Sequence, residues 1–403
     1  MKEIIVQKFG GSSVGDIEKI KNVARRVIDT KSKGYDVIVT VSAMGDTTDE
    51  LIEKALMISA NPSNREMDML LSTGEQVSVA LLAMAIQSMG HDVVSLTGAQ
   101  CGIITDSSHK KARINNIDTK RLHKELSEGK IIIVAGFQGI NENQDITTLG
   151  RGGSDTTAVA IAAAIGAAKC EIYTDVEGVY TADPRKVKSA RLMKRISYDE
   201  MLELAELGAG VLHPRSVELA RKFNVPLVVR SSFADSEGTE IVNMDQIEKV
   251  AIRGISLDDD IAKISVLEVP DRPGIAFKLF SMLSLNNINV DMIIQNVNRL
   301  SVNDISFTIK KDDLPDFLKI SENIKETIGA EKVTYDDSVA KLSIVGAGLA
   351  GSTEVMSKFF EALYELGINI QMISTSSIKI SCIIDRENAE NGMSKLHEKF
   401  QLS

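Results

Sequence analysis

Apolar and polar positions along the first 230 residues follow two alternating patterns. Short runs rich in β-branched residues predict strands at EIIVQ (3–7), DVIVTVS (36–42), IIIVAG (131–136), CEIYT (170–174) and VPLVVRS (225–231). Between these runs, apolar residues recur at helical spacing, first from Ile17 to Ile28 and then from Met67 to Met84. The alternation predicts an α/β fold with helices on the faces of a mainly parallel sheet. Because such sheets bind ligands beyond the carboxyl ends of their strands, the chemistry is expected just after these runs.

The polar stretch SSFADSEGTEIVNMDQ (231–246) predicts a domain boundary, and beyond it the chain repeats itself. AKISV (262–266) returns as AKLSI (340–344), and NNINVDMI (286–293) returns as LGINIQMI (366–373), a spacing of about 80 residues. Each copy reads as strand, loop, amphipathic helix and strand, which predicts two small α+β modules. We therefore expect three segments, at residues 1–245, 246–335 and 336–403. The repeat can be duplication alone, although DRPG (271–274) and GLAG (348–351) are loop-to-helix starts where a small zwitterion could bind.

Composition narrows the class of protein. The 403 residues are 43% hydrophobic and carry a formal charge of −10, which predicts a globular protein and disfavours nucleic acid or an anionic membrane as the main partner. AVAIAAAIGAA (158–168) is too short to span a bilayer and predicts a buried, alanine-rich helix. No leader pattern opens the chain, and its three cysteines show no paired spacing. These features favour the cytoplasm.

The first candidate site is QKFGGSS (7–13), in which Lys8 ends a strand and two glycines follow. Gly10 and Gly11 have no Cβ, so their backbone can turn tightly and bring N–H groups close to a bulky anion. The order of residues differs from the P-loop, where the lysine follows the glycines. A phosphate site and an ordinary strand-to-helix turn both remain open from these seven residues.

The second candidate site is TTLGRGGSDTTAVA (147–160). Ser154 and Asp155 stand just before the alanine-rich helix, where they can simply cap free N–H groups. Capping does not explain Arg151, whose planar guanidinium suits a carboxylate or phosphate. The positioned arginine, followed by Gly152 and Gly153, favours a ligand site over a cap.

Three further segments carry candidate residues. YTDVEGVYTADPR (173–185) follows a strand and is either a solvated turn or a nucleotide-side loop, with Pro184 holding Asp183 extended. Glu75 interrupts an apolar helical pattern; it either faces solvent or faces the cleft, where it could hold an ammonium group. VSAMGDTTDE (41–50) places Ser42, Thr47 and Thr48 on a turn after a strand.

Two patterns argue against other chemistry. VGAGLAG (345–351) matches a dinucleotide fingerprint, but the next strand offers Gln371 where a ribose-binding acid is needed, and too little chain follows for that domain. The five histidines form no catalytic or metal-binding arrangement. Phosphoryl transfer to a carboxylate tolerates this, because an ionised acceptor needs no general base and catalysis reduces to positioning and charge neutralisation.

Taken together, KFGGSS, SAMGDTTDEL, TLGRGGSDTTA, YTDVEGVYTADPR, QNV and ISTSSIKIS resemble the monofunctional aspartokinases over essentially the whole chain. The resemblance implies an amino-acid-kinase (carbamate-kinase-like) α/β domain followed by two ACT-type regulatory modules. It implies transfer of the ATP γ-phosphoryl group, with Mg²⁺, to the side-chain carboxylate of L-aspartate, the first step toward lysine, threonine and methionine.

The resemblance also assigns roles to residues. Lys8 and Asp155 would be catalytic, and the substrate site would comprise Ser42, Thr47, Thr48, Glu75, Arg151, Gly152, Gly153 and Ser154. The nucleotide would be bound by Lys8, Phe9, Gly10, Gly11, Thr174, Asp175, Tyr180, Asp183 and Arg185. No protein metal ligands are expected.

Regulation is a further implication of the resemblance. Relatives bind an inhibitory amino acid, lysine or threonine, between paired modules at positions that match Asp271, Gly274, Ala276, Gln295, Asn369 and Ile370. VPDRPGIAFK in the first module keeps the family pattern, whereas GLAGSTEVM in the second does not, so the effector stays open. A homo-oligomer formed through the modules is expected. A separate regulatory subunit started at Met244 is a further implication.

Two alternatives remain. The chain could be another amino-acid kinase, acting on glutamate, acetylglutamate or a nucleotide, although SAMGDTTDE, Glu75 and the repeat favour aspartate. It could also be a non-catalytic amino-acid sensor, but the retention of Lys8, Arg151 and Asp155 argues against that class.

Overall fold

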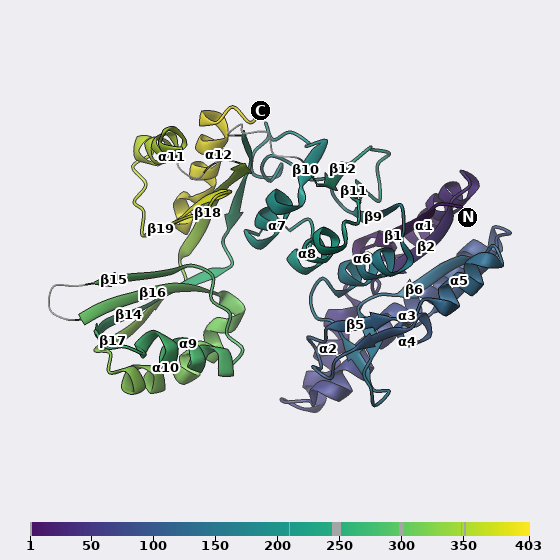
Figure 1. The fold of residues 1–403 in the computed structure, drawn as a ribbon, viewed down its shortest axis with the longest axis horizontal. Helices are drawn as coiled ribbons and strands as arrows, with labels where there is room; N and C mark the ends of the chain where they lie inside the picture. The colour runs from purple at the N-terminus through teal and green to yellow at the C-terminus, as the bar shows by residue number, and fades with distance from the viewer. Residues whose placement is uncertain (1, 209, 244–250, 298–301, 348, 350–351) are drawn as a thin grey trace. The chain divides into compact units, whose positions relative to one another are not determined.

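The chain divides into two compact units (Figure 1). The computed structural model describes residues 2–208, 210–243, 251–297, 302–347, 349 and 352–403. The first unit comprises residues 1–180, 192–206 and 210–245, and the second comprises residues 181–191, 207–209 and 246–403. Met244, the predicted internal start, lies outside the described residues.

The first unit is built on an eight-stranded sheet with the order β10-β12-β11-β9-β1-β2-β6-β3. Neighbouring strands run parallel except for β11 and β12. The strands are β1 (Ile4–Phe9), β2 (Asp36–Val41), β3 (Val93–Leu96), β6 (Ile131–Ala135), β9 (Lys169–Thr174), β10 (Arg195–Ser197), β11 (Leu227–Ser231) and β12 (Thr239–Val242). The mainly parallel sheet expected from the apolar runs is confirmed.

Helices cover both faces of this sheet because alternate side chains of each strand point to opposite faces. Phe9 of β1 packs into a core formed with α1 (Ile17–Ser32) and α3 (Asn64–Ser88). The preceding residue, Lys8, points to the other face and reaches α6 (Gly153–Ile165). α6 is the buried alanine-rich helix that the composition predicted.

A smaller sheet, with the order β5-β4-β7-β8, leads the chain into α6. Its strands are β4 (Ile103–Thr105), β5 (Ile114–Ile117), β7 (Gln138–Ile140) and β8 (Ile146–Thr148). The other helices of the unit are α2 (Thr47–Ile58), α4 (Gly98–Cys101), α5 (Lys120–Ser127), α7 (Tyr198–Glu206) and α8 (Pro214–Phe223), with a 3₁₀ turn at Gly11–Val14.

By length and composition alone, α3 could cross a membrane, and it is the one such helix within the described residues. Half of its most apolar window is buried inside the unit. It packs against α1, β3 and β6, as the core helix of a globular domain does.

The second unit contains two antiparallel sheets, with the orders β15-β16-β14-β17 and β19-β20-β18-β13. Its strands are β13 (Ala251–Asp258), β14 (Ile261–Pro270), β15 (Ile293–Val297), β16 (Val302–Lys310), β17 (Lys332–Asp336), β18 (Val339–Ala347), β19 (Met372–Thr375) and β20 (Lys379–Asp385). Its helices are α9 (Ile275–Leu285), α10 (Leu314–Ile328), α11 (Thr353–Glu365) and α12 (Ala389–Lys399).

The two sheets repeat one pattern, but one strand position is filled from a different part of the chain in each sheet. β17, which follows α10, pairs with β14 in the first sheet. The equivalent position beside β18 is taken by β13, which precedes the whole repeat in sequence. The elements of the two modules therefore interleave along the chain.

Two further sequence patterns can be located in the fold. The boundary stretch 231–246 ends the first unit but also supplies β12, which pairs with β10 and β11. VGAGLAG begins within β18, which pairs antiparallel with both neighbours, and this agrees with the argument from the sequence against a dinucleotide fold. Most of GLAG (348–351) lies outside the described residues.

Candidate active site

The turns that follow β1 and β2 touch closely, and this contact explains the glycine pair. A Cβ on Gly11 would lie 2.9 Å from the carbonyl oxygen of Ala43, closer than side chains tolerate. Gly74 on α3 approaches the same residue, since a Cβ there would lie 2.8 Å from the Ala43 Cβ. Gly10 has φ −73, a value open to any residue, so close approach is what requires glycine in this turn.

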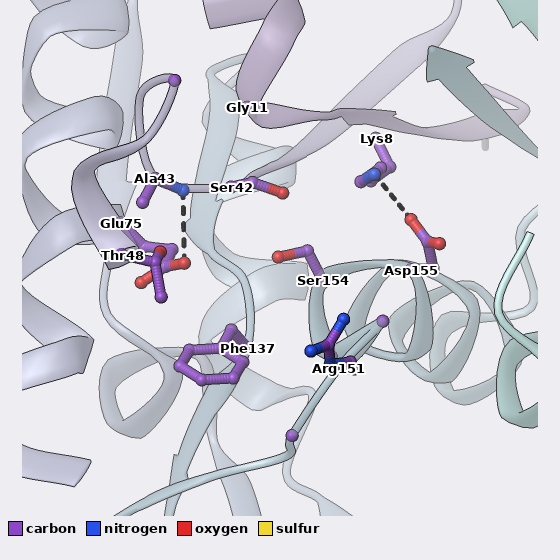
Figure 2. Close-up of a pocket in the computed structure, with 14 residues that line it drawn as sticks. Lys8, Gly11, Ser42, Ala43, Thr48, Glu75, Phe137, Arg151, Ser154 and Asp155 are labelled. Carbon is purple, nitrogen blue, oxygen red and sulfur yellow. Dashed lines mark hydrogen bonds and ion pairs between the residues drawn. The ribbon is translucent and has the colours of Figure 1, made fainter. Parts of the chain in front are cut away.

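These turns enclose one side of a cavity of about 300 Å³, shown in Figure 2. The pocket gathers side chains that are far apart in sequence at the carboxyl edge of the sheet. Ten predicted residues line it: Lys8, Gly11, Ser42, Thr48, Glu75, Arg151, Gly152, Gly153, Ser154 and Asp155.

An ion pair spans one side of the pocket. Lys8 Nζ lies 2.6 Å from Asp155 Oδ1, and each side chain is only 12% exposed. The pair joins the end of β1 to the first turn of α6 (Figure 2). Asp155 thus fixes the Lys8 ammonium group at the wall of the pocket.

Glu75 lies on the opposite side of the pocket, next to Thr48 in Figure 2. Its side chain is 3% exposed, and Oε1 accepts a hydrogen bond from the Ala43 N–H at 3.2 Å. Oε2 is also buried and has no hydrogen-bond partner within the part of the chain that the structure describes. Burial raises the pKa of Glu75 to about 7. A buried acceptor of this kind calls for a donor, and a ligand ammonium would supply one.

The start of α6 differs from the capping interpretation. The N-cap residue is Gly152, with φ 66, and no side chain caps the helix there. Ser154 and Asp155 instead belong to the first turn of the helix. The helix N-terminus, whose unpaired N–H groups favour anions, thus borders the pocket through Gly152 and Gly153.

Several predicted residues do not line the pocket. Phe9 is buried and stacks on Tyr173 with ring centroids 4.6 Å apart, and Thr47 Oγ1 donates to the Met44 carbonyl. Thr174 Oγ1 donates to Asp175 just after β9. Gly10 and Tyr180 also lie outside the set of lining residues.

Asp183 and Arg185 belong to the second unit. Their side chains form a two-pronged ion pair, with Arg185 Nε 3.0 Å from Asp183 Oδ1 and Nη2 2.9 Å from Oδ2. The same segment buries Ala182 and Val187 in the core of the second unit. Their predicted contact with nucleotide stays a prediction.

Four lining residues were missed by the sequence reasoning: Ala43, Gly45, Phe137 and Gly150. Phe137 comes just after Gly136, which follows β6, and has a left-handed φ of 69, a conformation that bulky residues rarely adopt. Its position just after the predicted strand IIIVAG (131–136) is the sequence signal for it, because ligands bind beyond the carboxyl ends of such strands.

The regulatory candidates lie in the second unit. Asp271 accepts a hydrogen bond from Asn303 at 3.0 Å, and Gly274, with φ 92, is the N-cap of α9, where Ala276 follows. Gln295 is exposed on β15, while Asn369 and Ile370 follow α11. Their neighbour Gln371 connects Lys263 to Asp385, so this region links the two sheets.

Comparison with known proteins identifies the family. The family model described as "Amino acid kinase family" matches residues 3–231, and ACT domain models match residues 264–329 and 342–400. The aspartokinase of Geobacillus stearothermophilus is 53% identical over 403 residues, covering 99% of this chain and 98% of the relative. The chain belongs to the aspartokinase family. The aspartokinase of Bacillus sp. (strain MGA3) is 51% identical, with the same coverage.

Solved aspartokinase structures share the fold. E. coli aspartokinase III in complex with aspartate and ADP (R-state) matches with a TM-score of 0.83 and 25% identity over 98% of this chain and 99% of that chain. The same enzyme in complex with lysine and aspartate (T-state) matches with a TM-score of 0.75 and 25% identity over the same shares. The predicted family and fold class are confirmed.

We expect Glu75→Gln to raise the free energy of unfolding of the first unit above pH 7 by about 3 kcal/mol and to change it little at pH 4. The folded protein keeps the Glu75 proton up to about pH 7, whereas the unfolded chain releases it near its ordinary value of 4.5. Stability is therefore lost as pH rises between these values, and glutamine has no proton to release.

The measurement is urea unfolding at pH 4 and pH 8, with unfolding of the first unit monitored by hydrogen exchange of the α3 amides. Glu66→Gln, at an exposed position of the same helix, is the control. Equal effects of Glu75→Gln at both pH values would contradict the assignment.

Proposed function

We propose that the pocket binds L-aspartate in line with the γ-phosphoryl group of ATP. The activity of this chain is that of an aspartate kinase, an ATP-dependent phosphotransferase that makes 4-phospho-L-aspartate. The observation that carries the proposal is the unpaired, buried Glu75 oxygen in one pocket with Arg151 and the Lys8–Asp155 pair. An acidic group, an arginine fork and a separate lysine suit a substrate with an ammonium and two carboxylates.

In this proposal the aspartate ammonium binds Glu75 Oε2 and restores the missing hydrogen bond. Arg151 binds a carboxylate through its guanidinium, and hydroxyl groups complete the site from Ser42 after β2, Thr48 at the start of α2 and Ser154 at the start of α6. Thr47 would contribute indirectly, because its hydroxyl donates to the Met44 carbonyl and so stabilises the turn after β2.

The transfer step needs two anions held in line and their repulsion reduced. An oxygen of the aspartate side-chain carboxylate forms a bond to the γ-phosphorus, the bond from that phosphorus to the β,γ-bridging oxygen breaks, and its electron pair leaves on ADP. Lys8 neutralises charge on the transferring group, and Asp155 keeps the Lys8 ammonium in place. The start of α6, with Gly152 and Gly153, stabilises negative charge nearby.

ATP is supported as the phosphoryl donor by the ADP present in the E. coli relative. Within the described residues, no three His, Cys, Asp or Glu side chains gather as a metal site. Mg²⁺ is proposed to arrive on the nucleotide, since that ion is commonly held by substrate phosphates with few protein carboxylates, and it would neutralise phosphate charge. Nucleotide contacts are proposed for Lys8, Phe9, Gly10, Gly11, Thr174, Asp175, Tyr180, Asp183 and Arg185.

We expect Lys8→Ala to lower kcat with aspartate by at least about 10²-fold and to change aspartate affinity little, since it removes charge that matters most in the transition state. The measurement is ADP release from Mg-ATP with L-aspartate, L-glutamate and N-acetyl-L-glutamate as acceptors. Lys124→Ala, at an exposed position on α5, is the control.

The acceptor panel separates the alternatives. Turnover on glutamate or acetylglutamate in place of aspartate would identify a different amino-acid kinase. A folded wild-type protein without turnover on any acceptor would favour the sensor function, and near-normal turnover of Lys8→Ala would remove Lys8 from the mechanism.

We further propose that the second unit binds an inhibitory amino acid, lysine or threonine. The E. coli relative was solved with lysine in its T-state, which supports lysine as the first candidate. Ligand contacts are proposed for Asp271, Gly274, Ala276, Gln295, Asn369 and Ile370. The face of α9 that carries Ala276 also exposes Phe277 and Leu285, at 76% and 82%, which supports a homo-oligomer formed through these modules.

We expect Asp271→Ala to weaken inhibition by lysine or threonine at least about 10-fold while kcat stays unchanged, because the variant removes a carboxylate suited to the effector ammonium. Inhibition constants for both amino acids are the readout, and Asp316→Ala on α10 is the control. Unchanged inhibition by both would place the effector elsewhere. A point variant is preferable to truncation at residue 245, because truncation would expose Ala182 and Val187.

A further inference from the structure

Arg151 is carried by a short turn whose backbone is unusual on both sides of it. The turn joins β8 to α6, and Gly150 and Gly152 have φ 79 and 66, both left-handed. A Cβ on Gly150 would lie 2.9 Å from the Lys110 carbonyl oxygen. The direction in which Arg151 leaves the backbone therefore depends on how the two ends of this turn are held.

The first end of the turn is held by Arg215 of α8. Its Nη1 donates to the Leu149 carbonyl at 2.9 Å, and its Nη2 donates to the Ala112 carbonyl at 2.9 Å. The Leu149 N–H donates in turn to the Phe137 carbonyl at 2.9 Å. One guanidinium thus joins the backbone at Ala112 to the backbone at Leu149. The same two segments also pair directly, because the Ala112 N–H donates to the Thr148 carbonyl.

The second end of the turn lies against His213. A Cβ on Gly152 would fall 2.2 Å from the His213 ring, so the imidazole fills the space that any other residue would need. The ring is itself fixed, because Nδ1 accepts from the Arg215 N–H at 3.3 Å and caps α8. Pro214 between them is the first residue of the helix and restricts the backbone further.

We propose that His213 and Arg215 are positioning residues for Arg151, which hold both ends of its turn so that the guanidinium meets the substrate carboxylate. The inference rests on the proposed function, since it assumes that Arg151 binds aspartate. Arginine suits the role because its planar fork reaches two carbonyl oxygens at once, which a lysine ammonium on a single stem does less well. Neither residue lines the pocket itself.

A double-mutant cycle tests the inference. Arg215→Gln should raise the aspartate KM at least about 10-fold and leave the ATP KM unchanged, because only the Arg151 turn loses its support. In an Arg151→Ala background, the same change should alter the aspartate KM less than about 2-fold, since the residue that it positions is gone. An unchanged aspartate KM, or an equal rise in both backgrounds, would overturn the proposal.

Further variants separate positioning from general stability. Arg221→Gln, on the same helix but in an exposed ion pair with Asp199, should leave both KM values unchanged. Arg215→Lys should give an intermediate aspartate KM, and it carries the test if Arg215→Gln does not fold. His213→Ala should raise the aspartate KM in the same way, and an unchanged value would remove His213 from the proposal.

The cycle also distinguishes this inference from the proposed function. If Arg151→Ala leaves the aspartate KM unchanged, then Arg151 does not bind substrate and both fail. If Arg151→Ala raises the aspartate KM but Arg215→Gln does not, the proposed role of Arg151 stands and only the positioning inference fails.

Discussion

The parallel pairing of β1 with β2 and β9 is the constraint on which the candidate site depends. Phe9 is in register with Val41 on one side and Tyr173 on the other, so the chain leaves all three strands at the same level of the sheet. Lys8, Ser42 and the segment after Thr174 are thereby brought to one edge although they are far apart in sequence. The Lys8–Asp155 ion pair then attaches the start of α6 to this edge and closes the pocket.

The second unit shows how a duplicated module can be joined without a simple boundary. β13 precedes the repeat yet completes the sheet of its second copy, so the first copy, β14 to β17, is contiguous and lies in sequence between the strands of the second. An ion pair adds to the connection between the sheets: Lys341 on β18, 2% exposed, pairs with Asp291, which precedes β15, and lies 3.8 Å from Asp258 of its own sheet.

Sequence patterns predicted what depends on local chemistry and missed what depends on long-range packing. β1 and α6 were recognisable because apolar spacing is a local property, and Lys8 and Arg151 stood out beside glycines. The burial of Glu75 was left open, because only the packing of α3 against the Ala43 turn decides it. The pairing of β13 with β18 and the placement of Asp183 in the second unit both depend on partners far away in the sequence. The hydrogen bond between Thr181 and His397 is an example. No local pattern records such pairings.

The crowding around Ala43 restricts the substitutions that the pocket backbone tolerates. Gly11 and Gly74 come from a turn and a helix that are remote in sequence, yet both lack side chains because the same small residue occupies the space between them. A side chain at position 11 would meet the Ala43 backbone, which no substitution removes, whereas a side chain at position 74 would meet the Ala43 Cβ, which only glycine at position 43 would remove. A single substitution by a larger residue at position 11 or 74 would therefore displace the Ala43 turn, and with it the backbone that lines the pocket.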